Sequence, residues 1–394
     1  MAIKSIKDMD IKGKRVFIRV DFNVPLDQSG VVKDDTRIRR SIPTIEYAVG
    51  QEARTILASH LGRPKGESRP EMSLRPVATR LQELMGREVR FAEDCVGSAA
   101  SAAVEALPGG GVLLLENLRF HAGETKNDPE FSHQLAFLAD VYVNDAFGTA
   151  HRAHASTVGI TQFLGDKGAG LLLKEELESL DKALANPKKP VVAIFGGAKV
   201  SDKLEVLRNL VSRMDTILIG GGMANTFLKA KGFRMGRSQT EDDMVAAADA
   251  ILDAAQKKGC TVLLPVDLVT GTKIEAGGRS GDTAVGTVPE NEMALDIGPK
   301  TAELFKKEIE KAGTIVWNGP MGVFEIDDFK AGTMAVAVAV ASASAFSVVG
   351  GGDTVRAVEQ FGVANKISYI STGGGAFMEF MEGKTLPGVA ALEQ

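Results

Sequence analysis

Short apolar runs recur along the whole chain, separated by stretches long enough to hold a helix. They cover residues 15–20, 55–58, 112–115 and 141–143 in the first half, and 191–195, 216–219, 261–264, 314–317, 346–349 and 367–370 in the second. Most are near-continuously apolar and rich in Val and Ile, which is typical of strands buried on both faces of a parallel sheet. Helical patterns fill several of the gaps, at residues 75–84, 129–139, 202–213, 240–258 and 299–311. This alternation predicts an α/β fold.

The chain divides near residue 186. Residues 171–185 have the leucine spacing of a long amphipathic helix, which ends at Asn186-Pro187, a helix stop, and Val191 opens a new series of strands. We therefore predict two Rossmann-like parallel-sheet lobes joined by a hinge helix. The expected ranges are 1–172 for the N-terminal lobe, 173–188 for the interdomain helix and 189–394 for the C-terminal lobe.

Composition and charge exclude several classes of protein. The chain has 46 Lys and Arg against 51 Asp and Glu, a net charge of −5, which argues against a general nucleic-acid or membrane-surface binder. No apolar run is long enough for a transmembrane helix, and residues 1–10 do not have the pattern of a signal peptide. Two cysteines cannot build a disulfide framework or a four-cysteine zinc site. We expect a cytoplasmic enzyme.

Arg, His, Asp and Asn follow four strands of the first half. In open α/β sheets, ligands bind beyond the carboxyl ends of the strands, so these side chains are expected on one rim. Arginine forks suit phosphate and carboxylate groups. The pattern predicts a cage for a small polyanion, with His60 and His151 as further donors and forks from Arg37, Arg63, Arg119 and Arg152. Taken singly, each arginine could equally be a solvated surface cation.

A metal site is the rival interpretation of the histidines. The sequence His151-x-x-His154 would place both rings on one helical face, but no Glu completes a zincin motif. We expect no metal there.

Glycine-rich segments follow the strands of the second half. They are 196–197, 220–222, 319–322, 350–352 and 373–375. Glycine lets backbone N–H groups approach a ligand closely, and helix N-termini attract phosphate. Three glycine triplets at three strand ends predict a nucleotide site, although a single triplet could be only a tight turn. The chain has no Walker A sequence, no G-x-G-x-x-G and no protein-kinase H-R-D or D-F-G motif.

Three polar positions stand out among these glycines. Lys199 and Lys203, expected on one face of a helix start, could reach a transferring phosphoryl group or be a solvated pair. Asp353, the one acid inside a glycine-triplet loop, suggests Mg²⁺, which takes one or two carboxylates, although it could also cap the next helix.

Together these segments resemble the phosphoglycerate kinase family, from Arg15 to Val389. The motifs that carry the resemblance are specific in combination: Ala58-Ser-His-Leu-Gly-Arg-Pro, Asn144-Asp-Ala-Phe-Gly-Thr-Ala-His-Arg-Ala-His, Gly196-Gly-Ala-Lys-Val, Val316-Trp-Asn-Gly-Pro-Met-Gly-Val-Phe-Glu and Gly350-Gly-Gly-Asp-Thr.

The resemblance implies a glycolytic phosphotransferase that moves a phosphoryl group between 1,3-bisphosphoglycerate and ADP, giving 3-phosphoglycerate and ATP with Mg²⁺, by hinge closure of two lobes. It implies an N-terminal lobe that binds phosphoglycerate through Asp21, Asn23, Arg37, His60, Arg63, Arg119 and Arg152. It implies a C-terminal lobe that binds nucleotide through Gly197, Ala198, Lys203, Gly221, Asn318, Pro320, Glu325, Gly351, Gly352, Asp353 and Thr354, with Asp353 at the metal.

Carried over in the same way, the groups around the transferring phosphoryl are Arg37, Lys199, Lys203, Gly373, Gly374 and Gly375. The family also implies a monomer whose C-terminal tail, from about residue 377, packs on the N-terminal lobe. Phe377 is a departure, because the family usually has Ser there, and residues 270–289 match only loosely and receive no role. The alternatives are a non-catalytic two-lobe protein that closes on an anion, and a dehydrogenase with an unusual dinucleotide loop.

Overall fold

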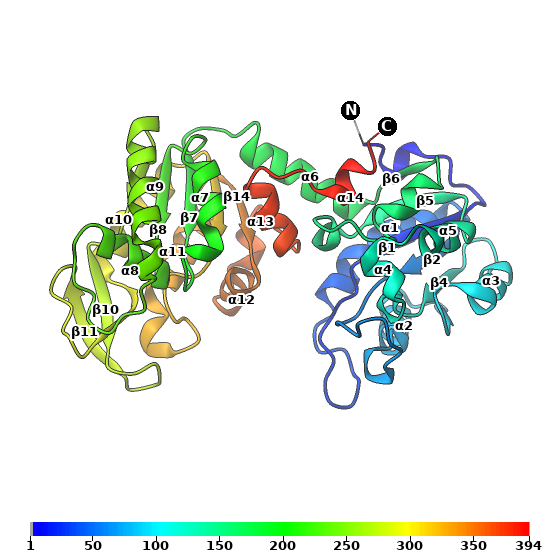
Figure 1. Ribbon diagram of the computed structural model, residues 1–394, viewed down its shortest axis with the longest axis horizontal. Helices are drawn as coiled ribbons and strands as arrows, with labels where there is room; N and C mark the ends of the chain where they lie inside the picture. The colour runs from blue at the N-terminus through cyan, green and yellow to red at the C-terminus, as the bar shows by residue number, and fades with distance from the viewer. Residues whose placement is uncertain (1–2, 394) are drawn as a thin grey trace. The chain divides into compact units, whose positions relative to one another are not determined.

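The computed structural model describes residues 3–393 and divides them into two compact units (Figure 1). The first unit holds the chain up to Leu177 together with the residues from Thr385 onward, and the second holds Glu178–Lys384. The helix α6 (Leu171–Leu184) contains the first point at which the chain passes from one unit to the other. The predicted class, α/β with two parallel sheets, is confirmed.

The first unit is built on a six-stranded parallel sheet in the order β3-β4-β2-β1-β5-β6. Its strands are β1 (Arg15–Val20), β2 (Arg54–Ala58), β3 (Arg90–Ala92), β4 (Val112–Leu115), β5 (Val141–Asp145) and β6 (Lys167–Ala169). The helices are α1 (Thr36–Gly50), α2 (Arg75–Met85), α3 (Gly97–Glu105), α4 (Ala122–Lys126), α5 (Pro129–Phe137) and α14 (Pro387–Ala390). Every residue of β4 and β5 is buried, which explains the continuous apolar character of β4 and of the first three residues of β5.

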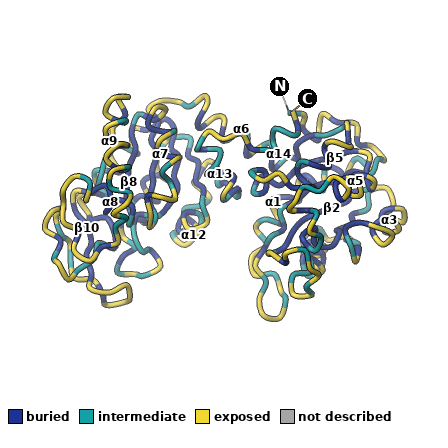
Figure 2. The backbone as a smooth tube through the Cα atoms, in the orientation of Figure 1, coloured by how far each residue is buried: buried dark blue, intermediate teal, exposed yellow. Residues whose placement is uncertain are grey.

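The second unit has its own six-stranded parallel sheet, in the order β15-β14-β13-β7-β8-β9. The strands are β7 (Val191–Phe195), β8 (Thr216–Ile219), β9 (Thr261–Leu263), β13 (Thr314–Asn318), β14 (Phe346–Gly350) and β15 (Tyr369–Ile370). The helices are α7 (Leu204–Leu210), α8 (Gly221–Ala230), α9 (Val245–Lys258), α10 (Pro299–Lys311), α11 (Ala331–Ser342), α12 (Gly352–Gln360) and α13 (Gly375–Met381). In both units the central strands of the sheet are buried, whereas the edge strands β3, β9 and β15 are only partly buried or exposed (Figure 2).

The structure adds strands that the hydrophobic pattern does not predict. The second unit contains a three-stranded antiparallel sheet of β10 (Asp267–Gly271), β11 (Arg279–Ala284) and β12 (Met293–Ile297), in the order β11-β10-β12. Strand β11, within the segment 270–289, carries exposed polar residues and has no apolar run to reveal it. Strands β3 and β6 have three residues each, too few for a periodic signal.

Local sequence explains where several helices begin and end. Helices α5 and α10 start with Pro129 and Pro299, at the position where the missing N–H of proline costs nothing. Asp128 caps α5 by accepting a hydrogen bond from the Phe131 N–H at 2.9 Å. Helix α9 ends at Gly259, whose φ of 75° is the left-handed conformation that glycine adopts at least cost.

The C-terminal residues complete the first unit. We expected the tail that packs on the first unit to begin at about residue 377. The chain instead returns to the first unit at Thr385, and α13, which contains residue 377, lies in the second unit. Figure 1 shows α14, in red, against the first unit, where the Gly388 N–H donates to the Ala150 carbonyl at 2.8 Å. Leu392 is fully buried.

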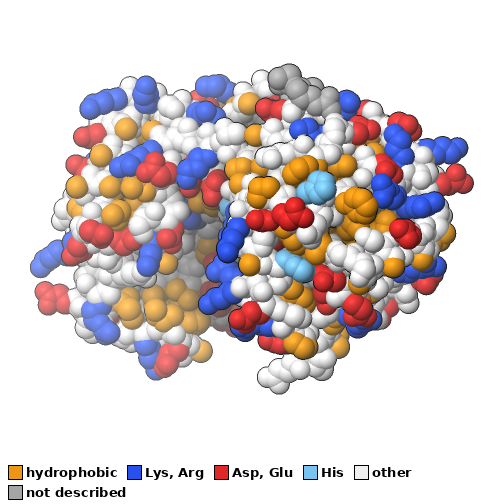
Figure 3. All heavy atoms as spheres, turned by 45° about the vertical axis from the view of Figure 1, so that its right-hand side comes forward, with side chains coloured by type: hydrophobic (Ala, Val, Ile, Leu, Met, Phe, Trp, Pro, Cys, Tyr) orange, Lys and Arg blue, Asp and Glu red, His pale blue; other side chains and the backbone are white. Residues whose placement is uncertain are grey.

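The surface carries mixed charge. On the face shown in Figure 3, basic and acidic side chains are interspersed over both units, as the near-equal numbers of each predict. Among residues 3–393, no helix combines the length and the apolar character that crossing a bilayer requires.

Candidate active site

The polar segments of the first unit converge because their strands are neighbours. They follow β1, β2, β4 and β5, which form the contiguous centre of the sheet in the order β4-β2-β1-β5. All four strands are parallel, so their carboxyl ends meet at one edge. The expectation that these segments share a rim therefore agrees with the sheet order.

A cavity of about 420 Å³ in this unit has an exclusively cationic set of charged lining residues. Three predicted arginines contribute to it: Arg63, Arg119 and Arg152. Lys65 and Lys126 line it as well, so five cations and no carboxylate belong to its lining. Such a cavity suits a compact polyanion carrying phosphate or carboxylate groups.

Arg119 is the most deeply placed of these cations. Only 7% of the residue is exposed, and its Nη1 donates to the Gly62 carbonyl at 2.8 Å. Its Nε is buried and has no hydrogen-bond partner among the described residues. Burial, with the charges of Arg19 and Arg152, lowers the pKa of Arg119 to about 10. A buried guanidinium with an unused donor is suited to an incoming anion.

Asp21, Asn23 and Arg37 form a second group outside the cavity lining. Arg37 Nη1 lies 3.2 Å from Asp21 Oδ2 and donates to the Asn23 carbonyl at 3.0 Å. Asn23 Oδ1 accepts from the Gly62 N–H at 2.9 Å, and the carbonyl of the same Gly62 accepts from Arg119. Gly62 therefore links this group to the cavity through its own backbone.

The two predicted histidine donors have different surroundings. His60 is 4% exposed, and its Nδ1 lies 3.1 Å from Arg19 Nη2. Burial, followed by the charges of Arg19, Arg119 and Arg37, holds the pKa of His60 well below its usual 6.5, so the ring is neutral. His151 Nε2 accepts from Arg152 Nε at 3.0 Å, which fixes the orientation of the two side chains relative to each other.

The second unit has a cavity of about 240 Å³ beyond the carboxyl ends of its own strands. Six predicted nucleotide-binding residues line it: Gly197, Ala198, Gly221, Pro320, Glu325 and Asp353. Apolar side chains of Ile274, Met293, Leu295 and Val323 line it too. Ile274 belongs to residues 270–289, to which the sequence analysis assigns no function. Glycines beside an apolar wall suit a phosphate group attached to a flat apolar base.

Glycine is required at the start of α8. Gly221 has a φ of +66°, and a Cβ there would lie 2.6 Å from the Gly197 nitrogen. Two glycine-rich segments thus approach each other more closely than a side chain at Gly221 would allow.

Five predicted nucleotide-binding residues lie outside the cavity lining: Lys203, Asn318, Gly351, Gly352 and Thr354. Lys203 Nζ donates to the Asn318 carbonyl at 2.8 Å and also to Asn318 Oδ1. Thr354 Oγ1 accepts from the Gly319 N–H at 2.6 Å. Burial lowers the pKa of Lys203 to about 8. In this structure the lysine is therefore held by Asn318 next to the glycine segments.

The expectation that Lys199 and Lys203 share a helical face is wrong. Helix α7 starts only at Leu204, and Lys203 closes a short 3-10 turn, Ser201–Lys203. Lys199 is exposed in the preceding loop, where Glu241 accepts from the backbone N–H groups of Val200 and Ser201. Glu241 thus binds the backbone N–H groups of the loop between the two lysines, and α7 begins only after Lys203.

Asp353 can hold a hard cation. Its side chain is 70% exposed and lines the cavity, and Arg356 Nη2 lies 3.0 Å from Asp353 Oδ1 and 2.6 Å from Glu325 Oε1. The N-cap of α12 is Gly351, so capping does not explain Asp353. One accessible carboxylate beside phosphate-binding glycines fits Mg²⁺, which keeps most of its water ligands.

The last glycine triplet precedes α13. Gly374 has a φ of +52°, and the Gly373 N–H donates to Ser371 Oγ at 3.1 Å. Phe377, where the family usually has Ser, is fully buried, and a Cβ on Gly350 would lie 2.5 Å from its ring. The phenyl ring thus packs beneath the Gly350 loop.

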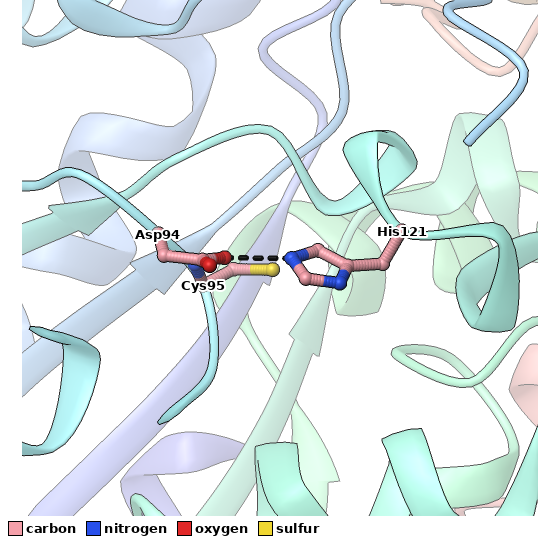
Figure 4. A group of neighbouring side chains, drawn as sticks. All are labelled: Asp94, Cys95 and His121. Atoms are coloured by element: carbon pink, nitrogen blue, oxygen red, sulfur yellow. Dashed lines mark hydrogen bonds and ion pairs between the residues drawn. The ribbon is translucent and has the colours of Figure 1, made fainter. Parts of the chain in front are cut away.

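One further cluster carries metal-ligand atoms, namely Asp94, Cys95 and His121 of the first unit (Figure 4). His121 Nε2 lies 2.7 Å from Asp94 Oδ1, a hydrogen-bond distance, whereas two ligands of one tetrahedral Zn²⁺ lie about 3.3 Å apart. Burial, with the nearby carboxylates of Asp94 and Glu124, raises the pKa of the Cys95 thiol well above its usual value. The cluster is therefore a hydrogen-bonded pair beside a protonated thiol.

Sequence reasoning missed Lys65 and Lys126 in the lining of the first cavity, and Arg19 in contact with His60. Arg19 gave a usable signal, because it is the one charged residue inside the apolar run Val-Phe-Ile-Arg-Val, and it is fully buried. The two lysines gave none, since they stand in polar segments like many surface lysines.

Comparisons with known proteins all lead to one family. Residues 6–384 match the family model described as phosphoglycerate kinase. The phosphoglycerate kinase of Moorella thermoacetica is 57% identical over 394 residues, all of both chains, and that of Koribacter versatilis is 57% identical over 100% of this chain and 99% of its own. The solved phosphoglycerate kinase of Coxiella burnetii superposes with a TM-score of 0.92 at 42% identity, covering 99% of each chain. That of Pyrococcus horikoshii has a TM-score of 0.85 at 36% identity over 98% of each. The chain belongs to the phosphoglycerate kinase family.

Proposed function

We propose that the first unit binds the phosphoglycerate and the second binds the nucleotide in the reaction of this family. The reaction itself is the glycolytic, reversible transfer of a phosphoryl group between 1,3-bisphosphoglycerate and ADP, which gives 3-phosphoglycerate and ATP. The observation that carries the division of roles is the pair of cavities. One is lined by five cations and no carboxylate, and the other by glycines, apolar side chains and the carboxylates of Glu325 and Asp353.

In the first unit, Arg63, Arg119 and Arg152 neutralise the anionic ends of the phosphoglycerate. Their planar forks can each donate two hydrogen bonds to a phosphate or carboxylate. Arg119 Nε, buried without a partner in the described structure, gains one when the substrate binds. Asp21 and Asn23 orient Arg37 from the side, and His60 adds a neutral donor.

In the second unit, backbone N–H groups near Gly197, Ala198, Gly221 and Gly351–Thr354 bind the nucleotide phosphates, with the base against Pro320 and the apolar wall. Glu325 accepts from the ribose hydroxyls. Asp353 holds Mg²⁺, which neutralises phosphate charge when bound. Arg356, bound to both carboxylates, fixes their positions.

Phosphoryl transfer depends on position and charge more than on covalent chemistry. An oxygen of the terminal nucleotide phosphate and an oxygen of the substrate carboxylate exchange the phosphoryl group, so no protein nucleophile is needed. Arg37, Lys199, Lys203 and the N–H groups of Gly373–Gly375 neutralise its three remaining oxygens. Lys203 exchanges its hydrogen bonds to Asn318 for bonds to the phosphoryl group.

The two ligands must meet in line with water excluded, because water would otherwise accept the phosphoryl group. Each proposed site belongs to a separate unit, so catalysis requires hinge closure, and α6 is the proposed hinge. One chain supplies every residue proposed here, and a monomer is therefore sufficient.

The test is a coupled product assay. The protein is mixed with Mg²⁺, ATP and 3-phosphoglycerate, the acyl phosphate is trapped with hydroxylamine, and ADP and hydroxamate are measured. Equal amounts of both, dependent on 3-phosphoglycerate, are expected. ADP without hydroxamate would indicate transfer to water and a failure of closure. Neither product, with both ligands still bound, would favour a non-catalytic anion-binding protein.

A further inference from the structure

Arg19 has an unusual position for an arginine. It lies inside β1, is fully buried, and all three nitrogens of its guanidinium group contact the protein. Nε donates to Ser156 Oγ at 2.8 Å, Nη1 donates to the Val20 carbonyl, and Nη2 lies 3.1 Å from His60 Nδ1. The side chain is fully buried and each of its nitrogens already contacts the protein, so we look for its role in the groups that it holds.

A buried carboxylate, that of Glu124, balances the charge of Arg19, and the side chain of Ser156 connects the two. Glu124, also fully buried, accepts from the Ser156 hydroxyl at 2.7 Å through Oε1 and from the Ser156 N–H at 3.0 Å through Oε2. Although burial raises the pKa of Glu124, His154, Arg19 and Ser156 together bring it below its usual value. Glu124 is therefore ionised and offsets an arginine that would otherwise be costly to bury.

The contact between Arg19 and His60 determines where the imidazole proton lies. A guanidinium group only donates hydrogen bonds, so His60 Nδ1 must accept and must carry no proton. The neutral ring then carries its proton on Nε2 and presents a donor there. The charged and titratable groups that act on this ring are Arg19, Arg37, Arg119 and His154, and the three arginines are cationic at neutral pH. All oppose a second proton on the imidazole.

We infer that Glu124 and Arg19, joined by Ser156, are positioning residues that fix His60 as the neutral Nε2–H tautomer, so that the ring donates a hydrogen bond to the substrate anion instead of pairing with it as a cation. The inference rests on the proposed placing of His60 in the phosphoglycerate site. It separates His60 from the arginines around it, which bind through charge.

Nuclear magnetic resonance of the histidine ring nitrogens tests the tautomer directly. In full-length protein labelled with ¹⁵N-histidine, the H60Q variant identifies the His60 signals. We expect Nδ1 without a proton and Nε2 with one across neutral pH, and a shift of Nε2 on adding 3-phosphoglycerate. A proton on Nδ1, in either the neutral or the charged ring, would overturn the inference.

Variants test whether the buried support acts on substrate binding. Glu124→Gln keeps the shape but removes the charge, and Ser156→Ala removes the link to Arg19. Each should raise KM for 3-phosphoglycerate about tenfold or more, the effect of losing one charge-assisted hydrogen bond. KM for ATP should change little, and the Nδ1 and Nε2 signals should report a mixture of tautomers.

Asp267→Asn is the matched control. Asp267 is a buried carboxylate of the second unit that accepts from the N–H groups of Lys300 and Thr301 and lines neither cavity. It should lower stability without changing KM for 3-phosphoglycerate.

If Glu124→Gln fails to fold, Ser156→Ala and the spectrum of the unmodified protein still test whether the buried residues fix the tautomer of His60. An Nε2–H tautomer that does not respond to 3-phosphoglycerate, in an enzyme that turns over normally, would overturn the role of His60 and leave the proposed reaction standing.

Discussion

At the scale of single residues, Lys203 shows how burial adjusts a charge for its task. Its ammonium group donates to Asn318, and burial brings its pKa to about 8. A lysine is cationic below its pKa and neutral above it, so Lys203 loses its charge as the pH rises through about 8. The affinity for a terminal phosphate must fall with that charge.

We expect kcat/KM for ATP to decrease above about pH 8, and Lys203→Arg to move this limb to higher pH, because arginine stays charged. The measurement is a pH–rate profile from pH 6 to 10. Lys257→Arg, an exposed residue at the end of α9, is the control and should leave the profile unchanged. If Lys203→Arg loses activity at the same alkaline pH as the unmodified protein, deprotonation of Lys203 does not cause the decrease in kcat/KM.

Arg37 and Arg39, two residues apart on α1, allow a matched comparison. Arg37 lies with Asp21 and Asn23, whereas Arg39 forms an exposed ion pair with Asp35 at 2.7 Å. Arg37→Ala should lower kcat by about 10²–10³-fold, the typical cost of one transition-state donor, with little change in the affinity for MgATP. Arg39→Ala should leave kcat unchanged. Steady-state kinetics with both substrates varied would show whether turnover survives without Arg37.

At the scale of elements, the first turn of α6 depends on a buried carboxylate. Asp145, the last residue of β5, accepts from the N–H groups of Leu172 and Leu173 at 2.9 and 3.2 Å. Burial raises its pKa from 3.8 to about 7, although these N–H groups and Thr44 oppose the change. The proposed hinge helix is thus attached to the first unit through a group that titrates near neutral pH.

The pKa of Asp145 predicts how stability depends on pH. Because its folded pKa lies above the unfolded value, the folded state binds more protons between about pH 4 and 7, and stability contributed by this group is lost as pH rises through that window. Asp145→Asn cannot titrate, so its stability relative to the unmodified protein should increase from pH 4 to pH 7 by up to a few kcal/mol. Urea unfolding at both pH values measures the difference. A constant difference would contradict the raised pKa.

The Gly350 loop, which carries the Gly-Gly-Gly-Asp-Thr motif, rests on the ring of Phe377. Phe377→Ala should destabilise the second unit by about 3–5 kcal/mol, since it removes a fully buried ring and leaves a cavity. The KM for ATP should rise as well, because the loop loses its support. Phe137→Ala, 69% exposed in the first unit, is the control and should change neither. Denaturant unfolding that shows equal stability for both variants would contradict the packing role.

At the scale of the whole molecule, the chain passes between the units twice, within α6 and again between Lys384 and Thr385. The residues after Thr385 therefore complete a unit that the first 177 residues began. The Gly388 N–H donates to the Ala150 carbonyl at 2.8 Å, and Ala150 stands two residues before Arg152 of the cationic cavity.

A Cβ on Gly388 would lie 3.0 Å from the Ala150 Cα, a backbone atom that cannot easily move. Gly388→Val should therefore destabilise the first unit by about 1–3 kcal/mol and weaken binding of 3-phosphoglycerate, with ATP binding retained. Thermal unfolding and calorimetric titration measure these effects. Gly165→Val, at a position with open space around it, is the control. Equal binding of 3-phosphoglycerate by both variants would show that the C-terminal segment does not support the site.

Several features follow from the sequence by itself. Strands such as β4 and β7 are continuous apolar runs because they are buried on both faces, and burial leaves a one-dimensional signal. The strand-end motifs gave the two groups of polar and glycine residues, because parallel strands bring their carboxyl ends to one edge. The strands β3 and β6 have only three residues each and leave no such signal, because they are recognisable as strands only by their pairing with β4 and β5.

Tertiary structure alone decided which of these groups touch. Arg19 meets His60, Glu124 reaches Arg19 through Ser156, and Lys203 turns to Asn318, in each case over more than thirty residues of sequence. The pKa changes of Lys203, Asp145 and His60 arise chiefly from burial, which is a property of the packed unit and not of the neighbouring residues in the chain. The sequence determined the chemistry available at each strand end, and packing decided the protonation and the contacts with which that chemistry operates.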